Sequence, residues 1–223
     1  LASLRRDDRV HLAAVDLRTE LLTESLAAGD SEALTEAVAA LEQVAPLGST
    51  DLAGALSAAR EQLAASTGAK AILYLGDGIS TANLLDSSTL NDVVAELREA
   101  RIPISSYALG PQVDGQLLAV LANHTGGNLY VAEEMVWQDE AAGISDARAQ
   151  AENLRNAERA GAELARWSRA LVAWPTEVQL DAALGQSYPE VFPPLRADRD
   201  TILIGQTGAK LDADVSVQVT VTS

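Results

Sequence analysis

The sequence contains no cysteine, which excludes disulfide bonds and thiolate chemistry and leaves the redox compartment open. A zinc site could use only carboxylates and the two histidines, His11 and His124. Neither histidine lies near a candidate nucleophile and no Gly-x-Ser-x-Gly occurs, so nothing supports acyl-transfer chemistry. We interpret His124 as a residue at a helix end and His11 as a half-buried strand residue.

Basic blocks and long apolar runs are also missing. The chain has 32 acidic and 16 basic side chains, a formal net charge of −16, and its basic residues are scattered. Because nucleic-acid binding needs a Lys/Arg surface that releases counterions, we expect no nucleic-acid partner. The acidic balance fits solubility, divalent cations or a basic protein surface. The longest apolar runs, such as KAILYLG at 70–76, are strand-sized, so no membrane span is expected.

The chain begins without an initiator methionine and without the regions of a signal peptide. We therefore expect it to be the interior of a longer protein. The sequence does not define the compartment, and a cell-envelope or secreted protein is the interpretation that we favour.

Strands and helices alternate over the first part of the chain. Residues 9–17 and 19–24 have the pattern of an antiparallel hairpin, and the run at 70–76 has that of a strand buried on both faces. Helical periods and further strands follow in alternation. The helices are expected at 30–45, 52–63, 89–100 and 115–124, and the strands at 102–109 and 128–134. This order predicts an α/β fold, a doubly wound and mostly parallel sheet with helices on both faces.

The sequence pattern changes twice after this domain, first to a long charged helical pattern and then to a β pattern. We predict an α/β domain at 1–137, a connecting helix at 138–174 and a β-strand module at 175–223. On the helix, one apolar stripe is expected to pack against the sheet domain or the β module, with Trp167 and Trp174 as anchors; it comprises Leu154, Ala157, Ala160, Leu164, Trp167 and Leu171. We count about three strands after Pro175, and so few strands need a covering layer, in part from outside this chain.

Two oxygen-bearing side chains stand where strands meet helices. Thr50 precedes the helix at 52–63, and Asp77 directly follows the strand at 70–76. In a doubly wound sheet both lie at the carboxyl edge, where ligands bind. A hydroxyl and a carboxylate suit Mg²⁺, Mn²⁺ or Ca²⁺. The alternative is structural: Thr50 or Asp51 caps its helix, and Asp77 and Gly78 form a turn.

These segments resemble a von Willebrand factor type A domain over about residues 8–134. DRVHLAAVDLRTELL, PLGSTDLAGALSAAREQL and AILYLGDGIST resemble the family's second and third strands, its Gly-x-Thr loop with a helix, and its fourth strand ending in Asp-Gly. The tail segment YPEVFPPLRADRDTILIGQTG resembles the segment that follows the A domain in inter-alpha-trypsin inhibitor heavy chains. The chain thus looks like the back part of a bacterial protein with this arrangement.

The resemblance implies a partial metal-ion-dependent adhesion site. Thr50 matches the family's second metal motif and Asp77 its third, although Gly76 stands where many relatives have Ser or Thr. The first motif, Asp-x-Ser-x-Ser, is missing, since VDLRTE has the wrong spacing and Asp16 is better interpreted as a strand-end residue. We expect an upstream segment to supply the central first strand and that motif. This chain alone should bind Mg²⁺, Mn²⁺ or Ca²⁺ only weakly.

The function implied is that of a non-enzymatic interaction or adhesion module, with a protein partner at the carboxyl edge. A second hypothesis is a structural scaffold with a degenerate site that binds no metal. A third is a nucleotide-binding enzyme domain, based on the Gly-x-Gly at 76–78. That motif is weak because the third glycine is absent and Asp77 would face the pyrophosphate.

Overall fold

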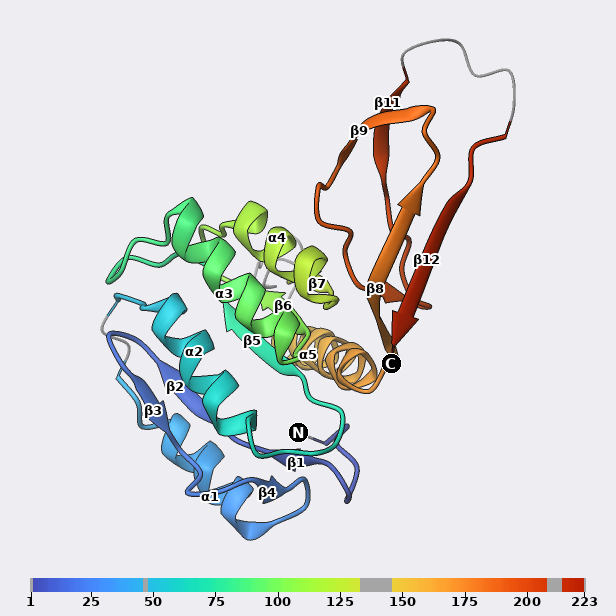
Figure 1. Ribbon diagram of the computed structural model, residues 1–223. Helices are drawn as coiled ribbons and strands as arrows, with labels where there is room; N and C mark the ends of the chain where they lie inside the picture. Colours follow the sequence, from blue (N-terminus) through green and yellow to red (C-terminus); the bar gives the residue numbers. More distant parts are fainter. Residues whose placement is uncertain (1, 46–47, 133–145, 208–213, 223) are drawn as a thin grey trace.

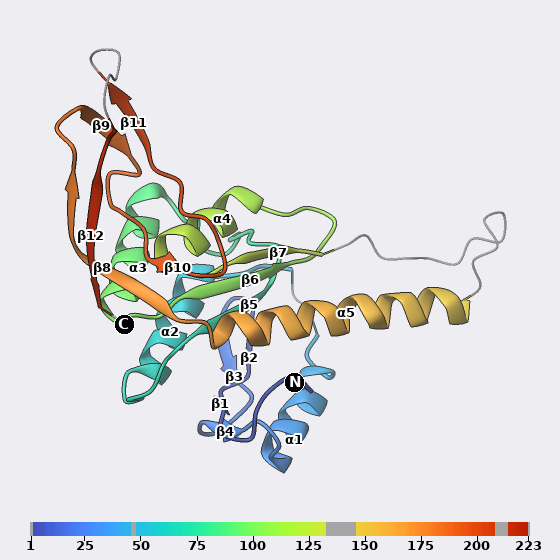
Figure 2. The ribbon, with the colours of Figure 1, turned by 90° about the vertical axis from the view of Figure 1, so that its right-hand side faces the viewer.

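A three-stranded parallel sheet forms the centre of the molecule. The computed structural model describes residues 2–45, 48–132, 146–207 and 214–222. The sheet has the order β5-β6-β7, and its strands are β5 (Ile72–Gly76), β6 (Ile104–Ala108) and β7 (Leu129–Val131). One face of the sheet is covered by α2 (Leu52–Leu63), α3 (Ser87–Glu99) and α4 (Gly115–Thr125), and the other by α5 (Asp146–Ser168) (Figures 1 and 2). This confirms the predicted doubly wound α/β fold.

The apolar core lies between the sheet and the three helices on its first face. Its fully buried members come from α2, α3, β6 and α4; they include Leu52, Leu56, Leu97, Ile104 and Leu121. Burying a leucine or isoleucine side chain stabilises the fold by roughly 1.5–3 kcal/mol. The buried residues of α2, α3 and α4 form one cluster with Ile104 of β6, the most buried strand of this sheet.

The N-terminal part forms two small antiparallel pairs. The expected hairpin is confirmed as β2 (Ala13–Val15) paired with β3 (Thr19–Leu21). A second pair, β1 (Arg9–Val10) with β4 (Ala27–Ala28), was not expected from the sequence. The helix α1 (Glu32–Leu41) follows, and Ser31 caps it by accepting a hydrogen bond from the Leu34 N–H.

The sheet is interrupted between β2 and β5. Within the described residues β2 pairs only with β3, and β5 pairs only with β6. Figures 1 and 2 show β2 between β3 and β5, so the spatial order is β3-β2, an unpaired interval, then β5-β6-β7. The prediction that β5 is buried on both faces is wrong, because none of its residues is fully buried and the Leu75 side chain is 59% exposed. The physical reason is that β5 is an edge strand here, whereas β6 has a neighbour on each side.

The helix expected at 138–174 is shorter at its C-terminal end. It ends at Ser168, and residues 172–174 already belong to strand β8; residues 138–145 lie outside the described residues. Within the predicted apolar stripe, Ala160 and Leu164 are buried against the sheet, but Leu154 and Leu171 are exposed. The first half of α5 extends past the sheet (Figure 2), which explains why Leu154 finds no cover there.

The tail has more strands than the sequence indicated. Instead of three, it contains β8 (Val172–Leu180), β9 (Leu184–Tyr188), β10 (Leu195–Arg196), β11 (Ile204–Thr207) and β12 (Val217–Thr222). They form the sheets β10-β8-β12 and β11-β9. Strand β8 was missed because it contains Pro175, which argues against a strand interior. The structure accommodates Pro175 at a register shift of β12 between Thr220 and Val221.

Two tail arginines tie the β module to the sheet domain. The Arg196 side chain is fully buried and donates to Gly126 O at 2.9 Å, just beyond α4, and to Trp167 O in α5 at 3.3 Å. Arg199 donates to Gly127 O at 2.6 Å and Asn123 O at 3.3 Å. The tail therefore contacts α4 as well as α5. The proposed division at 137 and 174, and the dependence of the tail on a covering layer, stay predictions.

Candidate functional site

Thr50 and Asp77 lie on neighbouring loops at the carboxyl edge of the sheet. Thr50 precedes α2, and its N–H donates to Thr81 Oγ1 at 3.3 Å. In return, the Ser80 hydroxyl and the Ala82 N–H both donate to Thr50 O, at 3.2 and 3.1 Å. The loop that begins at Asp77 is thus fastened directly to Thr50 by backbone and hydroxyl groups.

The helix cap is Asp51, not Thr50. Asp51 Oδ1 accepts from the Gly54 N–H at 2.9 Å, and the Asp51 N–H donates to Asp16 O at 2.8 Å. Within the described part of the chain, Thr50 Oγ1 has no hydrogen-bond partner. Of the two residues that the structural alternative offered as caps, Asp51 is therefore the one that caps α2.

Asp77 begins a turn, as the structural alternative proposed. Its Oδ1 accepts from the Ile79 N–H at 2.9 Å, and its backbone O accepts from the Asp114 N–H at 2.8 Å. Gly78 has φ +79°, and a Cβ there would lie 2.8 Å from Leu118 Cγ. This glycine is required by the turn and by packing, so it needs no nucleotide to explain it. The second carboxylate oxygen of Asp77 has no partner among the described residues.

Tyr74 is a site residue that sequence reasoning missed. Its hydroxyl accepts from the Gly78 N–H at 3.2 Å, and a Cβ at Gly76 would lie 2.5 Å from that hydroxyl oxygen. Burial raises the pKa of Tyr74, and the charge of Asp77 adds to this, while the Gly78 N–H acts in the opposite direction. Tyr74 thus occupies the space that a side chain at position 76 would need. The sequence feature that could have indicated this is the tyrosine hydroxyl itself, since Tyr74 is the one polar side chain in the apolar run ILYLG and lies two residues before Gly76.

Asp16, His11 and His124, which the sequence also offered as possible ligands, have local structural partners or surroundings. Asp16 follows β2 and accepts from the Arg18 N–H, in keeping with a strand-end residue. His11 Nδ1 lies 2.9 Å from Thr23 Oγ1. His124 is in the last turn of α4, where burial and, second, the charge of Arg98 lower its pKa. Over the ranges that the structure describes, no group of three or more His, Asp or Glu could hold a metal.

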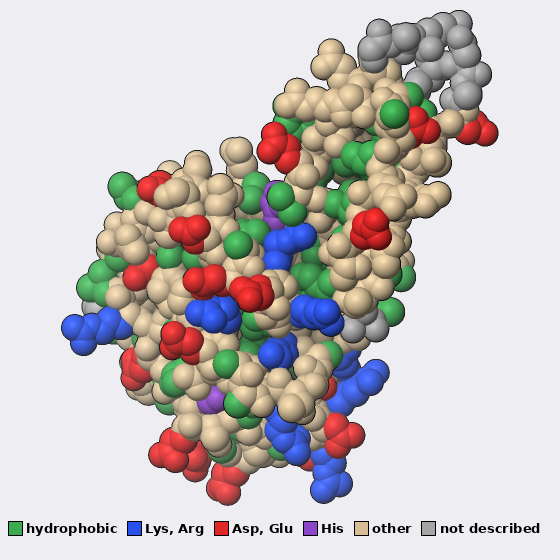
Figure 3. All heavy atoms as spheres, viewed as in Figure 1, with side chains coloured by type: hydrophobic (Ala, Val, Ile, Leu, Met, Phe, Trp, Pro, Cys, Tyr) green, Lys and Arg blue, Asp and Glu red, His purple; other side chains and the backbone are tan. Residues whose placement is uncertain are grey.

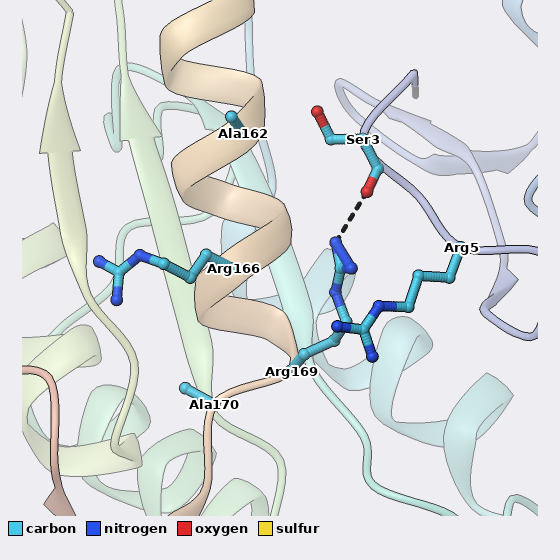
Figure 4. A pocket seen from close by; sticks show the side chains of 6 residues that line it. All are labelled: Ser3, Arg5, Ala162, Arg166, Arg169 and Ala170. Atoms are coloured by element: carbon cyan, nitrogen blue, oxygen red, sulfur yellow. Dashed lines mark hydrogen bonds between the residues drawn. The ribbon is translucent and has the colours of Figure 1, made fainter.

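A hollow of about 480 Å³ lies elsewhere, between the N-terminal segment and α5 (Figure 4). Its lining comprises Ser3, Arg5, Ala162, Arg166, Arg169 and Ala170. Arg169 crosses it to donate to Ser3 O at 2.7 Å, and Arg166 pairs with Glu163 and Asp198. None of the residues predicted from the sequence as site residues lines this hollow.

None of the described helices has the length and apolarity that a membrane crossing requires.

Three solved structures are similar to parts of this chain. A bacterial von Willebrand factor type A protein from Catenulispora acidiphila superposes with a TM-score of 0.54 at 14% identity, covering 82% of this chain and 42% of that one. The human COPII-coat protein Sec24c gives a TM-score of 0.50 at 13% identity, over 84% of this chain and 30% of that one. Manganese-loaded TRAP protein from Plasmodium vivax gives 0.44 at 19% identity, over 54% of this chain and 49% of that one.

This chain therefore spans less than half the length of these structures. No curated protein matches its sequence. The family description of the von Willebrand factor type A domain matches residues 1–131, more than half of the 223 residues. With the parallel sheet, its covering helices and the polar loops at the carboxyl edge, this match establishes that the chain belongs to the von Willebrand factor type A domain family.

Proposed function

We propose that this chain is a non-enzymatic interaction or adhesion module whose carboxyl edge binds a protein partner through a divalent cation. Thr50 and Asp77 supply two of the metal ligands, and an upstream segment of the same protein supplies the rest. Domains of this family typically mediate protein–protein interaction or adhesion, which supports the general class. The observation that carries the proposal is that Thr50 Oγ1 and one Asp77 oxygen, both unpaired among the described residues, stand on two loops bonded to each other.

The chemistry of these ligands selects the ion. A hydroxyl and a carboxylate are hard oxygen donors, which suit Mg²⁺, Mn²⁺ or Ca²⁺ better than softer metals. Two protein oxygens leave most of a six-coordinate shell to water, so the affinity of this part of the site should be low. In the family resemblance, the missing ligands come from an Asp-x-Ser-x-Ser loop at the end of the first strand.

The interval in the sheet supports the place of that first strand. On β5, Ile72 N–H donates to Pro103 O and Gly76 O accepts from the Leu109 N–H, so both residues face β6. Because main-chain groups alternate in direction along a strand, those of Leu73 and Leu75 face the free edge. Next to β2, Leu12 O accepts from the Leu22 N–H and the Asp16 N–H donates to Arg18 O, so both residues face β3. By the same alternation, the main-chain groups of Ala13 and Val15 face away from β3, toward the interval.

Both edges also run in the same direction. Asp16, at the end of β2, bonds to Asp51 at the edge where Asp77 ends β5. A strand inserted between them would be parallel to both, and its C-terminal loop would emerge beside Thr50 and Asp77. We define this interval, bounded by residues 13–15 and 73–75, as the strand slot.

The tail belongs to the proposal only in a general way. Its likeness to the segment after the A domain of inter-alpha-trypsin inhibitor heavy chains suggests that the parent protein combines these two parts. The contacts of Arg196 and Arg199 with the end of α4 support a tail that holds a defined position relative to the interaction domain.

The test is a calorimetric titration of the intact protein, upstream segment included, with Mn²⁺. Asp77→Ala should weaken Mn²⁺ binding at least about tenfold, since even outer-shell partners of a metal contribute this much. Thr50→Val should weaken it too, and partner binding should lose its metal dependence. Asp92→Ala, an exposed carboxylate on α3, is the matched control. Unchanged Mn²⁺ affinity in Asp77→Ala, with an intact fold by circular dichroism, would refute the metal assignment.

A structural scaffold without metal is the second candidate. The observation in its favour is that the cap of Asp51 and the turn of Asp77 give two acidic residues of the edge a structural role. In that case the intact protein binds neither Mn²⁺ nor Mg²⁺, and Asp77→Ala only loosens the loop. A titration with ATP and NAD in the same series tests the nucleotide-binding hypothesis, for which we expect no heat of binding.

A further inference from the structure

We infer that the carboxyl edge carries an apolar docking surface for a protein partner that presents basic and apolar side chains together. Four exposed side chains, which we name the apolar rim, define it. They are Leu17, Leu84, Leu109 and Val113, with exposed fractions of 55%, 82%, 40% and 36%. The inference deepens the proposed function by naming the chemistry of the partner, and it rests on that function only for the choice of this edge.

Two rim residues, Leu17 and Leu84, each follow a residue that is hydrogen-bonded to Asp51. Leu17 directly follows Asp16, whose backbone O accepts from the Asp51 N–H at 2.8 Å. Leu84 directly follows Asn83, whose side-chain amide donates to Asp51 Oδ1 at 3.4 Å. Two residues that lie far apart in the sequence are thereby placed around the start of α2.

The other two rim residues, Leu109 and Val113, lie beside Asp77 through contacts of their own or of the next residue. The Leu109 N–H donates to Gly76 O at 3.2 Å. The next residue is Gly110, and a Cβ placed on it would lie 3.4 Å from Asp77 Cβ. Val113 precedes Asp114, whose N–H donates to Asp77 O at 2.8 Å. Each rim residue is thus at most one residue away from a direct contact with Asp51, Asp77 or the glycine before Asp77.

Single exposed leucines are common on protein surfaces, but a group around one site is not. All four lie in loops that follow a strand or precede a helix, where polar turn residues are the usual choice. Figure 3 shows apolar side chains at the left margin, beside the starts of α2 and α3, while acidic side chains are spread over the helical face. Leu75 is not counted, because the strand slot accounts for its exposure.

The charge of the same loops selects the partner. They hold five carboxylates and one cation, namely Asp16, Asp51, Asp77, Asp86, Asp114 and Arg18. Asp51, Asp86 and Asp114 cap helices through one oxygen, and the positive ends of these helices offset part of the charge. The edge remains acidic, in a chain of net charge −16. A second copy, a nucleic acid or an anionic membrane would be repelled, whereas a protein surface with Arg or Lys among apolar side chains is complementary.

The experiment is a selection from a displayed library of random peptides against the intact protein, once with Mn²⁺ and once with EDTA. Enriched peptides should carry Arg or Lys flanked by Leu, Val, Phe or Trp. By fluorescence anisotropy, the double variant Leu17→Ser and Leu84→Ser should bind an enriched peptide about tenfold more weakly or worse. The matched control is Leu154→Ser with Ile202→Ser, two side chains on α5 and in the tail whose exposed fractions, 61% and 73%, lie between those of Leu17 and Leu84.

The outcomes separate this inference from the metal proposal. Enrichment that depends on the rim in both Mn²⁺ and EDTA supports the rim and counts against a metal-dependent function. Enrichment of peptides that lack basic and apolar side chains, an equal loss in the control variant, or no enrichment at all would overturn the inference. Normal Mn²⁺ affinity in the rim variant shows that the loss comes from the docking surface and not from the metal site.

Discussion

At the start of α2, neighbouring side chains have different roles. Asp51 accepts from the Gly54 N–H and so satisfies one of the unpaired amides at the helix end, while the Thr50 hydroxyl makes no such bond among the described residues. Tyr74 similarly separates structure from function, because its hydroxyl fills the space above Gly76. At this scale, a stability measurement distinguishes capping from ligand binding.

Asp51→Ala should lower the free energy of unfolding by about 1 kcal/mol, the usual contribution of an N-cap. Thr50→Val should leave it nearly unchanged, because only a solvated hydroxyl is lost. Urea denaturation of both variants measures the difference. Equal destabilisation by the two substitutions would contradict the assignment of the cap to Asp51.

At the scale of elements, Arg196 joins three parts of the chain. Its guanidinium reaches Gly126 O beyond α4, Trp167 O in α5 and the Asp198 carboxylate at 2.7 and 2.8 Å. Arg166 adds a second cation to Asp198 at 3.2 Å. Because an unpaired buried charge is destabilising, the ionised Asp198 carboxylate stabilises Arg196 in this place.

This arrangement predicts a loss of stability in acid. The hydrogen bond from Arg196 lowers the pKa of Asp198 below its ordinary value of 3.8, with further lowering by the charges of Arg196 and Arg166. The stabilisation is therefore complete above pH 3.8 and is lost as the pH falls through the lowered value of the folded state. Thermal melts between neutral and acidic pH should show a smaller decline for Asp198→Asn than for the wild type. Parallel declines would show that Asp198 does not contribute.

At the scale of the whole molecule, the strand slot divides the sheet. Strands β2 and β5 are not paired with each other, and the main-chain groups of residues 13, 15, 73 and 75 face the interval between them. Exposed edges of this kind pair readily with another strand. The state of these amides reports whether the slot is filled.

Hydrogen exchange gives the corresponding prediction. In the 223-residue chain, the amides of Leu73 and Leu75 should exchange at least about tenfold faster than those of Ile72 and Tyr74, which face β6. In a longer protein that includes the upstream segment, all four should be protected, because the inserted strand pairs with the free edge. Equal protection in the shorter chain would mean that the edge is already paired.

The sequence by itself determined the elements with a strong local period and the place of the candidate ligands. Helices α1 to α4 and strands β5 to β7 follow from the spacing of apolar residues, and the order of elements puts Thr50 and Asp77 at one edge. These features depend on residues close together in the chain. The same local signal allowed for a cap at Thr50 or Asp51, and the structure assigns it to Asp51.

The tertiary structure alone decided which strands have neighbours and what covers each face. Pro175 lies in a strand because β12 shifts register opposite it, and Leu75 is exposed because β5 pairs on one side only. The contact between Arg196 and the end of α4 joins residues 70 positions apart. No periodicity can indicate such pairings, because their free energy arises from contacts between segments that meet only after the chain has folded.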